Sequence, residues 1–381
     1  MTDGILESIK QRDTLFDKQN ADRDDDEISQ KYRRYRNKVN RIVDKARELY
    51  EYNLFDKVSD DSKKTWNELN KYFKKKSSSS SLPTELQVGE KKYTNPKPIL
   101  DNLNDYLAKK GHNLASNLPQ PTTSIYDSLG SPCFNDMKLT KIKTCEISDI
   151  IKNDLQNHKS PGYDNVHAVL IKWSSHIISP ILEKIFNRFF DIGDYPDYLK
   201  IAKVTALHKG GDASLAENYR PISVLPHINK IFEKLIHVRM SDHIEKQKIL
   251  SNSQFGFRKG HSTSHGISNL QNKIIEHLEK KNICAVLFID LKSAFDTIDP
   301  DILIKKLQHY GFRGKISNLL KSYLTGRKQF IQYGTIESEL LEGLCGVPQG
   351  SVLGPLLFIL YIMILKNVVN LRLCCLLMMP L

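Results

Sequence analysis

The sequence has few cysteines, and none of them has a metal-binding spacing. Its six cysteines stand at positions 133, 145, 284, 345, 374 and 375, with no Cys-x-x-Cys pair and no histidine at zinc-finger spacing. This pattern argues against a structural zinc site and a disulfide framework, and it favours a reducing compartment. It does not distinguish the nucleus from the cytoplasm.

A long hydrophobic run is also missing. The N-terminus is polar from the start and has no apolar core segment, so no signal peptide is predicted. The longest apolar stretch, from Val352 to Leu365, contains Gly354 and Pro355. It is shorter than the roughly 20 residues needed to span a bilayer. We therefore expect no membrane partner, and an interaction module anchored by the apolar C-terminus is the least favoured of the alternatives.

Acidic residues are outnumbered by basic ones. The 381 residues contain 56 Lys and Arg against 44 Asp and Glu, which gives a net charge of +12. Such a surplus favours a polyanionic partner, nucleic acid before membrane. Between Lys31 and Arg47 eight basic residues face the single acid Asp44. Apolar residues recur there at helical spacing, which predicts a basic amphipathic helix that either binds phosphates or is simply solvated.

An apolar run at residues 285–289 ends at Asp290. Its β-branched and aromatic residues predict a short strand buried on both faces. A carboxylate at the rim of such a strand must be hydrated, paired or bound to a metal. For a lone aspartate, capping a turn is the simpler alternative.

Two basic segments suit nucleic-acid chemistry. Residues 202–223 alternate into a Gly-rich turn and predict a β-hairpin. Lys209 and Arg220 on it could both approach a triphosphate, Arg as a bidentate fork and Lys as a point charge. Residues 254–263 interleave glycines, aromatics and cations, which suits a loop that stacks on bases and contacts phosphates, with Arg258 as first candidate. The alternative is a purely structural loop.

The remaining pattern is mostly helical. A helix is expected over 99–110, with Gly111 as its stop. Further helices are expected over 171–190, 229–244 and 316–324, and another from Pro300 with Asp299 as its cap. Residues 328–333 alternate like an edge strand, and an apolar helix follows Gly354.

Several of these strings resemble one protein family. Phe288-Ile289-Asp290-Leu291 followed by Ala294-Phe295-Asp296 resembles the first catalytic box of reverse transcriptases from jockey-like non-LTR retrotransposons. The string from Gly346 to Pro355 resembles their Pro-Gln-Gly box. Lys159-Ser160-Pro161-Gly162 and Asn218-Tyr219-Arg220-Pro221 are similar to their fingers. The resemblance covers roughly residues 25 to 362.

The resemblance implies an α+β fold of right-hand polymerase fingers and partial palm, preceded by a helical linker. Residues 1–118 would be the basic linker that joins endonuclease to polymerase in the family, with a serine run at 77–81 as a flexible joint. Residues 119–200 would extend the fingers, 201–362 would form fingers and partial palm, and 363–381 would be an out-of-frame tail. The implied function is RNA-directed DNA synthesis. The implied partners are an RNA template, a DNA primer and deoxynucleoside triphosphates, with no stable protein partner.

The family also implies roles for single residues. Asp290 would be catalytic and, with the carbonyl of Leu291, would bind Mg²⁺. Lys209, Arg220, Phe295, Gln349 and Gly350 would bind the nucleotide, Phe295 by screening the sugar 2′ position. Arg258 would contact the template.

One expected box is missing. The family carries a Phe-Ala-Asp-Asp hairpin after the Pro-Gln-Gly helix, whereas this chain ends in Leu376-Leu377-Met378-Met379. A one-base shift near Ile362 would convert the expected codons into the residues observed. We therefore expect an incomplete, inactive polymerase, with a non-catalytic nucleic-acid-binding fragment as the alternative. The lost hairpin would leave an unpaired edge beside the Asp290 strand and lower solubility.

Overall fold

The computed structural model describes residues 2–21, 25–59, 61, 64–66, 68–69, 82–118, 124–291 and 293–364. The chain divides into two compact units, Met1–Ser81 and Leu82–Leu381. The division falls before the segment 82–118, which the sequence pattern had assigned to the linker. The serine run at 77–81 and the tail from residue 365 lie outside the described residues.

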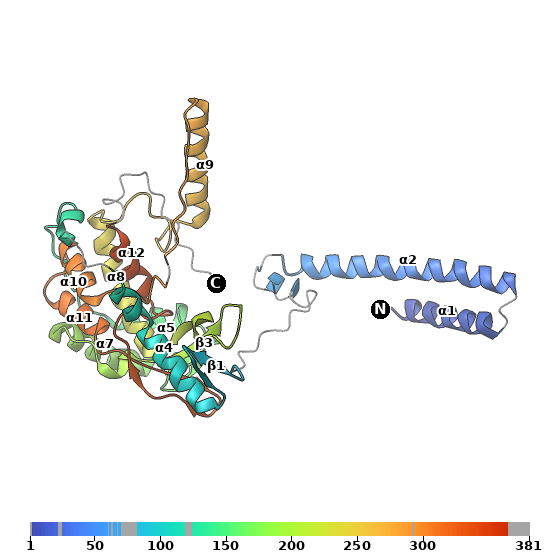
Figure 1. Ribbon diagram of the computed structural model, residues 1–381, viewed down its shortest axis with the longest axis horizontal. Helices are drawn as coiled ribbons and strands as arrows, with labels where there is room; N and C mark the ends of the chain where they lie inside the picture. The colour runs from blue at the N-terminus through green and yellow to red at the C-terminus, as the bar shows by residue number, and fades with distance from the viewer. Residues whose placement is uncertain are drawn as a thin grey trace. The chain divides into compact units, whose positions relative to one another are not determined.

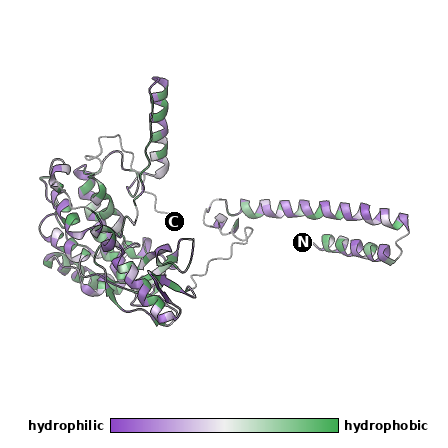
Figure 2. Ribbon diagram, in the orientation of Figure 1, coloured by the Kyte–Doolittle hydropathy of each residue, from purple (hydrophilic) through white to green (hydrophobic). Residues whose placement is uncertain are grey.

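The first unit contains a helical hairpin of α1 (Asp3–Ala21) and α2 (Asp26–Asp56), drawn in blue in Figure 1. Asp25 begins α2 by accepting hydrogen bonds from the amides of residues 27 and 28. The predicted basic amphipathic helix is confirmed. Within the described residues its apolar stripe is largely uncovered, because Val39 is buried but Leu49 and Tyr50 are exposed. Figure 2 shows this helix as mostly hydrophilic with scattered apolar residues.

The second unit combines a mixed sheet with many helices. Among the described residues, a small ribbon pairs β1 (Leu86–Val88) with β2 (Lys91–Tyr93). The main sheet contains β3 (Ile201–His208), β4 (Tyr219–Val224), β5 (Lys328–Tyr333), β6 (Ile336–Glu337) and β7 (Leu341–Glu342). Its order is β4-β3-β5-β6, and β7 also pairs with β5. This mixture agrees with the predicted α+β class.

The predicted hairpin is confirmed, because β3 and β4 pair antiparallel from Lys203 opposite Val224 to His208 opposite Tyr219. The edge position predicted for residues 328–333 is wrong. β5 lies inside the sheet, parallel to β3 and antiparallel to β6 and β7. Alternation along a strand reports which face is buried, but it does not report how many neighbours the strand has.

The helices of this unit are α4 (Pro96–Ser116), α5 (Thr144–Asn153), α6 (Ala168–Trp173), α7 (Ser175–Ile192), α8 (His227–Lys246), α9 (Thr263–Glu279), α10 (Pro300–His309), α11 (Lys315–Leu324) and α12 (Gly354–Ile362). Short 3₁₀ turns occupy Ile125–Ser128, Asp197–Lys200 and Ala216–Asn218. The predicted cap is confirmed, because Asp299 accepts from the amide of Ile302 at 2.9 Å. A large apolar core joins α5, α7, α8, α10, α11 and α12.

Helix α4 covers the sheet and forms a second core with it. Its leucines at 100, 103 and 107 pack with Val204 of β3 and Ile331 of β5. Asn104 is fully buried and donates to the carbonyl oxygen of Gln329 at 3.3 Å and to that of Glu339 at 2.9 Å. These contacts fix α4 to the sheet, so the segment 82–118 is part of the globular unit.

The helix stop predicted at Gly111 is wrong, because α4 continues to Ser116. A Cβ placed on Gly111 would come within 1.8 Å of the carbonyl oxygen of Asp296. Glycine inside a helix costs about 1 kcal/mol relative to alanine. Here it permits a close approach between two backbones, which explains why it does not end the helix.

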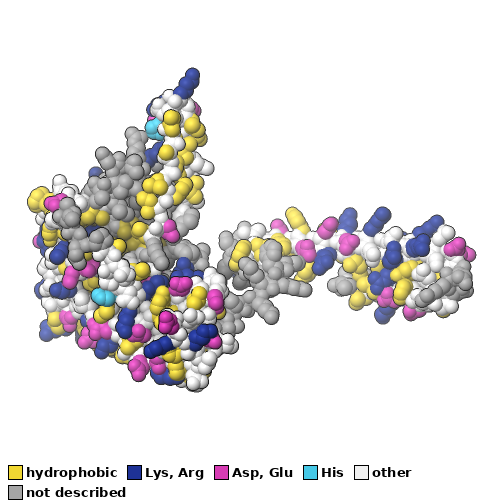
Figure 3. All heavy atoms as spheres, viewed as in Figure 1, with side chains coloured by type: hydrophobic (Ala, Val, Ile, Leu, Met, Phe, Trp, Pro, Cys, Tyr) yellow, Lys and Arg dark blue, Asp and Glu magenta, His cyan; other side chains and the backbone are white. Residues whose placement is uncertain are grey.

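The buried strand predicted at residues 285–289 is also wrong. This segment has no regular structure, and Leu287 and Phe288 are 71% and 81% exposed. A strand needs a neighbour for its backbone hydrogen bonds, and no strand of the described residues pairs with this segment. Helix α9 just before it projects from the body in Figure 1, and Figure 3 shows hydrophobic side chains along it.

Within the described ranges, no helix combines the length and the apolar character that a bilayer crossing requires.

Candidate functional site

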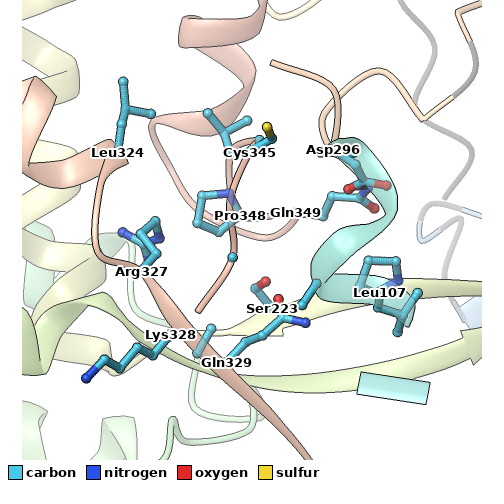
Figure 4. A pocket seen from close by; sticks show the side chains of 17 residues that line it. Leu107, Ser223, Asp296, Leu324, Arg327, Lys328, Gln329, Cys345, Pro348 and Gln349 are labelled. Carbon is cyan, nitrogen blue, oxygen red and sulfur yellow. Dashed lines mark hydrogen bonds between the residues drawn. The ribbon is translucent and has the colours of Figure 1, made fainter. Parts of the chain in front are cut away.

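A cavity of about 70 Å³ lies where helix α4, the β3–β4 hairpin, strand β5 and the Pro-Gln-Gly loop meet (Figure 4). Its wall comes from segments far apart in the sequence. Polar residues that line it are Ser223, Asp296, Arg327, Lys328, Gln329 and Gln349. At this cavity the hairpin lies beside the Pro-Gln-Gly loop.

A backbone hydrogen bond joins the hairpin directly to the Pro-Gln-Gly loop. The amide of Ser223 on β4 donates to the carbonyl oxygen of Gln349 at 2.7 Å. Gly350 has a φ of +119°, and a Cβ there would lie 2.5 Å from the carbonyl oxygen of Ser223. Only glycine accepts both the left-handed backbone and this contact. The predicted site residues Gln349 and Gly350 are therefore held against the hairpin.

Asp296 lies at the centre of this arrangement. Gln349 donates to its Oδ1 from Nε2 at 2.8 Å, a contact visible in Figure 4. The ammonium of Lys110, from α4, lies 3.8 Å from Oδ2. The backbone beside it is fixed too, because the amide of Val347 donates to the carbonyl oxygen of Phe295 at 2.9 Å. One carboxylate thus connects α4 with the Pro-Gln-Gly loop.

The electrostatics of the cluster follow from burial and from an excess of cations. Burial raises the pKa of the Asp296 carboxyl, while Lys110, Gln349, Lys209 and Arg220 act to lower it. Burial also lowers the pKa of Lys209. The nearby charges of Lys110 and Arg220 lower it further, and Asp296 opposes them. The predicted residues Lys209 and Arg220 therefore share one electrostatic environment with Asp296.

Phe295 lies in the core. Its ring is 8% exposed and stacks on Phe358 of α12, with 4.8 Å between ring centroids. In this arrangement the ring anchors α12 behind the site. Its predicted role beside the sugar stays a prediction.

Asp290 and Leu291 lie on the exposed irregular segment and do not line the cavity. Nowhere in the described ranges do three or more His, Cys, Asp or Glu side chains gather closely enough to hold a metal ion. The described donor set therefore does not fit a two-metal centre.

Arg258 is bound to another helix. Its guanidinium forms two hydrogen bonds of 3.1 Å to the Glu245 carboxylate of α8, and it also donates to the carbonyl oxygen of Ser251 at 3.2 Å. A template phosphate would have to compete with Glu245 for it. The predicted template contact stays a prediction, and the structural-loop alternative gains support from these bonds.

The sequence pattern assigned no role to Lys110, Asp296 or Glu233. Glu233 is fully buried on α8 and accepts from the amide of Val352 at 2.5 Å, just before α12. It also accepts from Asn229 and Tyr323. No signal in the sequence marked Glu233, because its helical neighbours three and four residues away are mostly polar. For Lys110 the signal was the adjacent Gly111, which marks a close backbone approach.

Comparison with known proteins identifies a family that part of the chain matches. The family described as reverse transcriptase (RNA-dependent DNA polymerase) matches residues 207–378. Over these residues the chain is similar to the reverse transcriptase family. The reverse transcriptase region begins within β3, so it contains Lys209, Arg220, Asp296 and Gln349, whereas Lys110 precedes it. Reverse transcriptases generally use divalent metal ions.

The chain is also similar to individual curated proteins. The chain is 34% identical over 251 residues to the probable RNA-directed DNA polymerase from transposon X-element of Drosophila melanogaster, covering 64% of this chain and 26% of that protein. It is 36% identical over 233 residues to the corresponding protein from transposon BS, covering 61% and 26%. It is 31% identical over 235 residues to that of the mobile element jockey, covering 61% and 25%. The resemblance to jockey-like reverse transcriptases is confirmed, and the chain spans about a quarter of the length of these relatives.

Proposed function

We propose that the chain is the fingers and first part of the palm of an RNA-directed DNA polymerase from a jockey-like non-LTR retrotransposon. The observation that carries the proposal is the meeting of the β3–β4 hairpin with the Pro-Gln-Gly loop. The charges of Lys209 and Arg220 on the hairpin act on Asp296, the carboxylate to which Gln349 of the loop donates a hydrogen bond.

These residues suit an incoming deoxynucleoside triphosphate. The guanidinium of Arg220 offers a planar fork to phosphate oxygens, and Lys209 offers a compact point charge. The Gln349 amide is fixed by Asp296, and Gly350 keeps the loop close to β4. The residues of this chain would thus bind and orient the nucleotide.

Catalysis needs more than this chain encodes. By resemblance Asp290 and the carbonyl of Leu291 are the predicted oxygen ligands for Mg²⁺, but the described donor set does not fit a metal centre, so no step of this proposal depends on a bound ion. Where the family carries Phe-Ala-Asp-Asp, this chain has Leu376-Leu377-Met378-Met379. We propose that residues 363–381 are out-of-frame translation and that the chain is inactive as encoded.

Nucleotide binding tests the proposed site. The chain is bound to an RNA template with a DNA primer, and the affinity for the complementary deoxynucleoside triphosphate is measured. Arg220→Gln should weaken binding about tenfold, since a charge-assisted hydrogen bond contributes about 1.5–3 kcal/mol. The matched control is Arg188→Gln, which replaces an exposed arginine on α7. It should leave the affinity for the deoxynucleoside triphosphate unchanged. Equal affinities of wild type and Arg220→Gln would contradict the proposal.

The alternative is a nucleic-acid-binding fragment without a nucleotide site. The surplus of basic residues favours it. It predicts that the logarithm of the RNA-binding constant falls linearly with the logarithm of the salt concentration. Salt-dependent RNA binding without any nucleotide binding would favour this alternative over the polymerase site.

Primer extension tests the loss of catalysis. We expect no extension by the chain as encoded, because losing carboxylates that act as one unit lowers rates by orders of magnitude. Extension by the unshifted chain would refute the proposed inactivity.

A further inference from the structure

Lys110 is a buried lysine held at a fixed place. Its side chain is 8% exposed, and its ammonium reaches Asp296 from α4. The position of α4 is fixed, because Asn104 forms a hydrogen bond to β5 and Gly111 lies against the backbone of Asp296. The neighbouring Lys109 points elsewhere, is exposed and pairs with Asp105 at 2.6 Å. Of these two adjacent lysines, Lys110 therefore lies beside Asp296 and Lys109 does not.

The cluster has more positive than negative charge. Lys110, Lys209 and Arg220 act on the single carboxylate of Asp296. The charges of Lys110 and Arg220 act against the charged form of Lys209, and partial burial makes such repulsion stronger than in water. The repulsion is relieved when an anion with several charges binds among them. Such an anion must enter beside the hairpin, where Lys209 is exposed and Arg220 half-buried.

We propose that Lys110 is a third phosphate-binding cation of the nucleotide site, and that Asp296 is the counter-ion that neutralises it until a triphosphate arrives. The inference rests on the proposed function and extends it to a helix outside the reverse transcriptase match. A lysine ammonium has three donors, so it can keep Asp296 and contact a phosphate oxygen at once. Helix α4 would then be part of the substrate site as well as of the fold.

Inorganic tripolyphosphate is the direct probe, because it carries the phosphates without base or sugar. The full chain is titrated with it, and the dissociation constant is compared across variants. Lys110→Met should weaken binding about tenfold. Lys109→Met removes the same net charge from the next residue and should leave binding unchanged.

The variant Asp296→Asn tests whether Asp296 acts as a counter-ion of Lys110 or only supports the fold. Asparagine still accepts a hydrogen bond from Gln349, but it no longer competes for the ammonium. We expect tripolyphosphate binding to tighten about threefold, whereas damage to the fold would weaken it. Because Lys110→Met leaves a buried carboxylate without its ion pair, the double variant Lys110→Met/Asp296→Asn is compared with Asp296→Asn alone. It should bind about tenfold more weakly.

The outcomes are distinguishable. Unchanged binding in both Lys110 variants overturns the inference and leaves the proposed nucleotide site standing, provided Arg220→Gln still weakens binding. Weaker binding by Asp296→Asn overturns its role as counter-ion. A wild-type chain that binds neither tripolyphosphate nor deoxynucleoside triphosphate overturns both proposals.

Discussion

Glu233 is a buried carboxylate on which the Pro-Gln-Gly loop depends. Burial raises the pKa of its carboxyl, while the charge of Arg327 and several hydrogen bonds act against that shift. Its two oxygens accept from the amide of Val352 and from the side chains of Asn229 and Tyr323. Because it holds the residues just before α12, it fixes the end of the loop that carries Gln349.

Replacing this carboxylate should destabilise the fold. Glu233→Leu leaves these donors buried without an acceptor, and an unsatisfied buried group costs about 1–3 kcal/mol. We expect the free energy of unfolding to fall by about 3 kcal/mol or more in urea denaturation. The exposed Asp242 on the same helix gives the control Asp242→Leu, which should be nearly neutral. Equal effects of the two substitutions would show that Glu233 does not support the loop.

Lys306 gives a pH-dependent prediction. It is 4% exposed, and its ammonium donates to the carbonyl oxygen of Tyr361 at 2.5 Å. Burial lowers its pKa to about 8. Above that pH the unfolded chain binds more protons than the folded one, so the free energy of unfolding should rise with pH. The slope should approach about 1.4 kcal/mol per pH unit from this group.

Urea denaturation between about pH 7.5 and 9.5 measures this slope. Lys306→Met should remove the rise, because methionine keeps the packing without a titrating group. Lys305, the exposed neighbour on α10, supplies the control Lys305→Met, which should keep it. A wild-type chain whose stability does not change over this range would show that Lys306 is not buried as an ammonium.

Among single residues, Gln349 and Gly350 lie beside the hairpin because a positive φ and a backbone contact specify that turn. Their predicted role in nucleotide binding stays a prediction. Lys110 was not recognised, because its importance depends on Asp296, which is far away in the sequence. A pairing between distant segments leaves no periodic signal in either one.

Helix α4 is the element whose importance the sequence underestimated. Its apolar stripe predicted the helix, but nothing in the stripe indicated what it would cover. The structure shows that it closes one face of the sheet and one side of the candidate site. The opposite error concerned residues 285–289, where strand propensity was high but no partner strand is present among the described residues. A strand depends on its neighbours more than a helix does.

The substitution Gly111→Ala, which adds one methyl group, tests the contact between α4 and Asp296. Gly111→Ala would place a Cβ within 1.8 Å of a carbonyl oxygen, so one of the two backbones must move. We expect a loss of about 2 kcal/mol or more in unfolding free energy, despite the better helix propensity of alanine. Gly343→Ala, where a Cβ meets nothing within 4 Å, is the control. A stabilised Gly111→Ala variant would mean that α4 does not approach Asp296 this closely.

For the whole molecule, the decisive question is where the globular unit begins. Composition placed the change at about residue 118, because the segment before it is polar and basic. The structure begins the compact unit at Leu82. Polar composition was misleading here, since α4 needs only one apolar stripe and the buried Asn104 to join the sheet.

Two truncations distinguish these boundaries. A chain starting at Leu82 should melt within about 2 °C of the full-length chain, because it keeps every contact of the second unit. A chain starting at residue 119 loses Leu100, Leu103 and Leu107 and uncovers Val204 and Ile331. Burial of a leucine contributes about 1.5–3 kcal/mol, so its melting temperature should fall by at least about 10 °C. If both truncated chains melted like the full-length chain, α4 would be a linker helix after all, and Lys110 could not be part of the site.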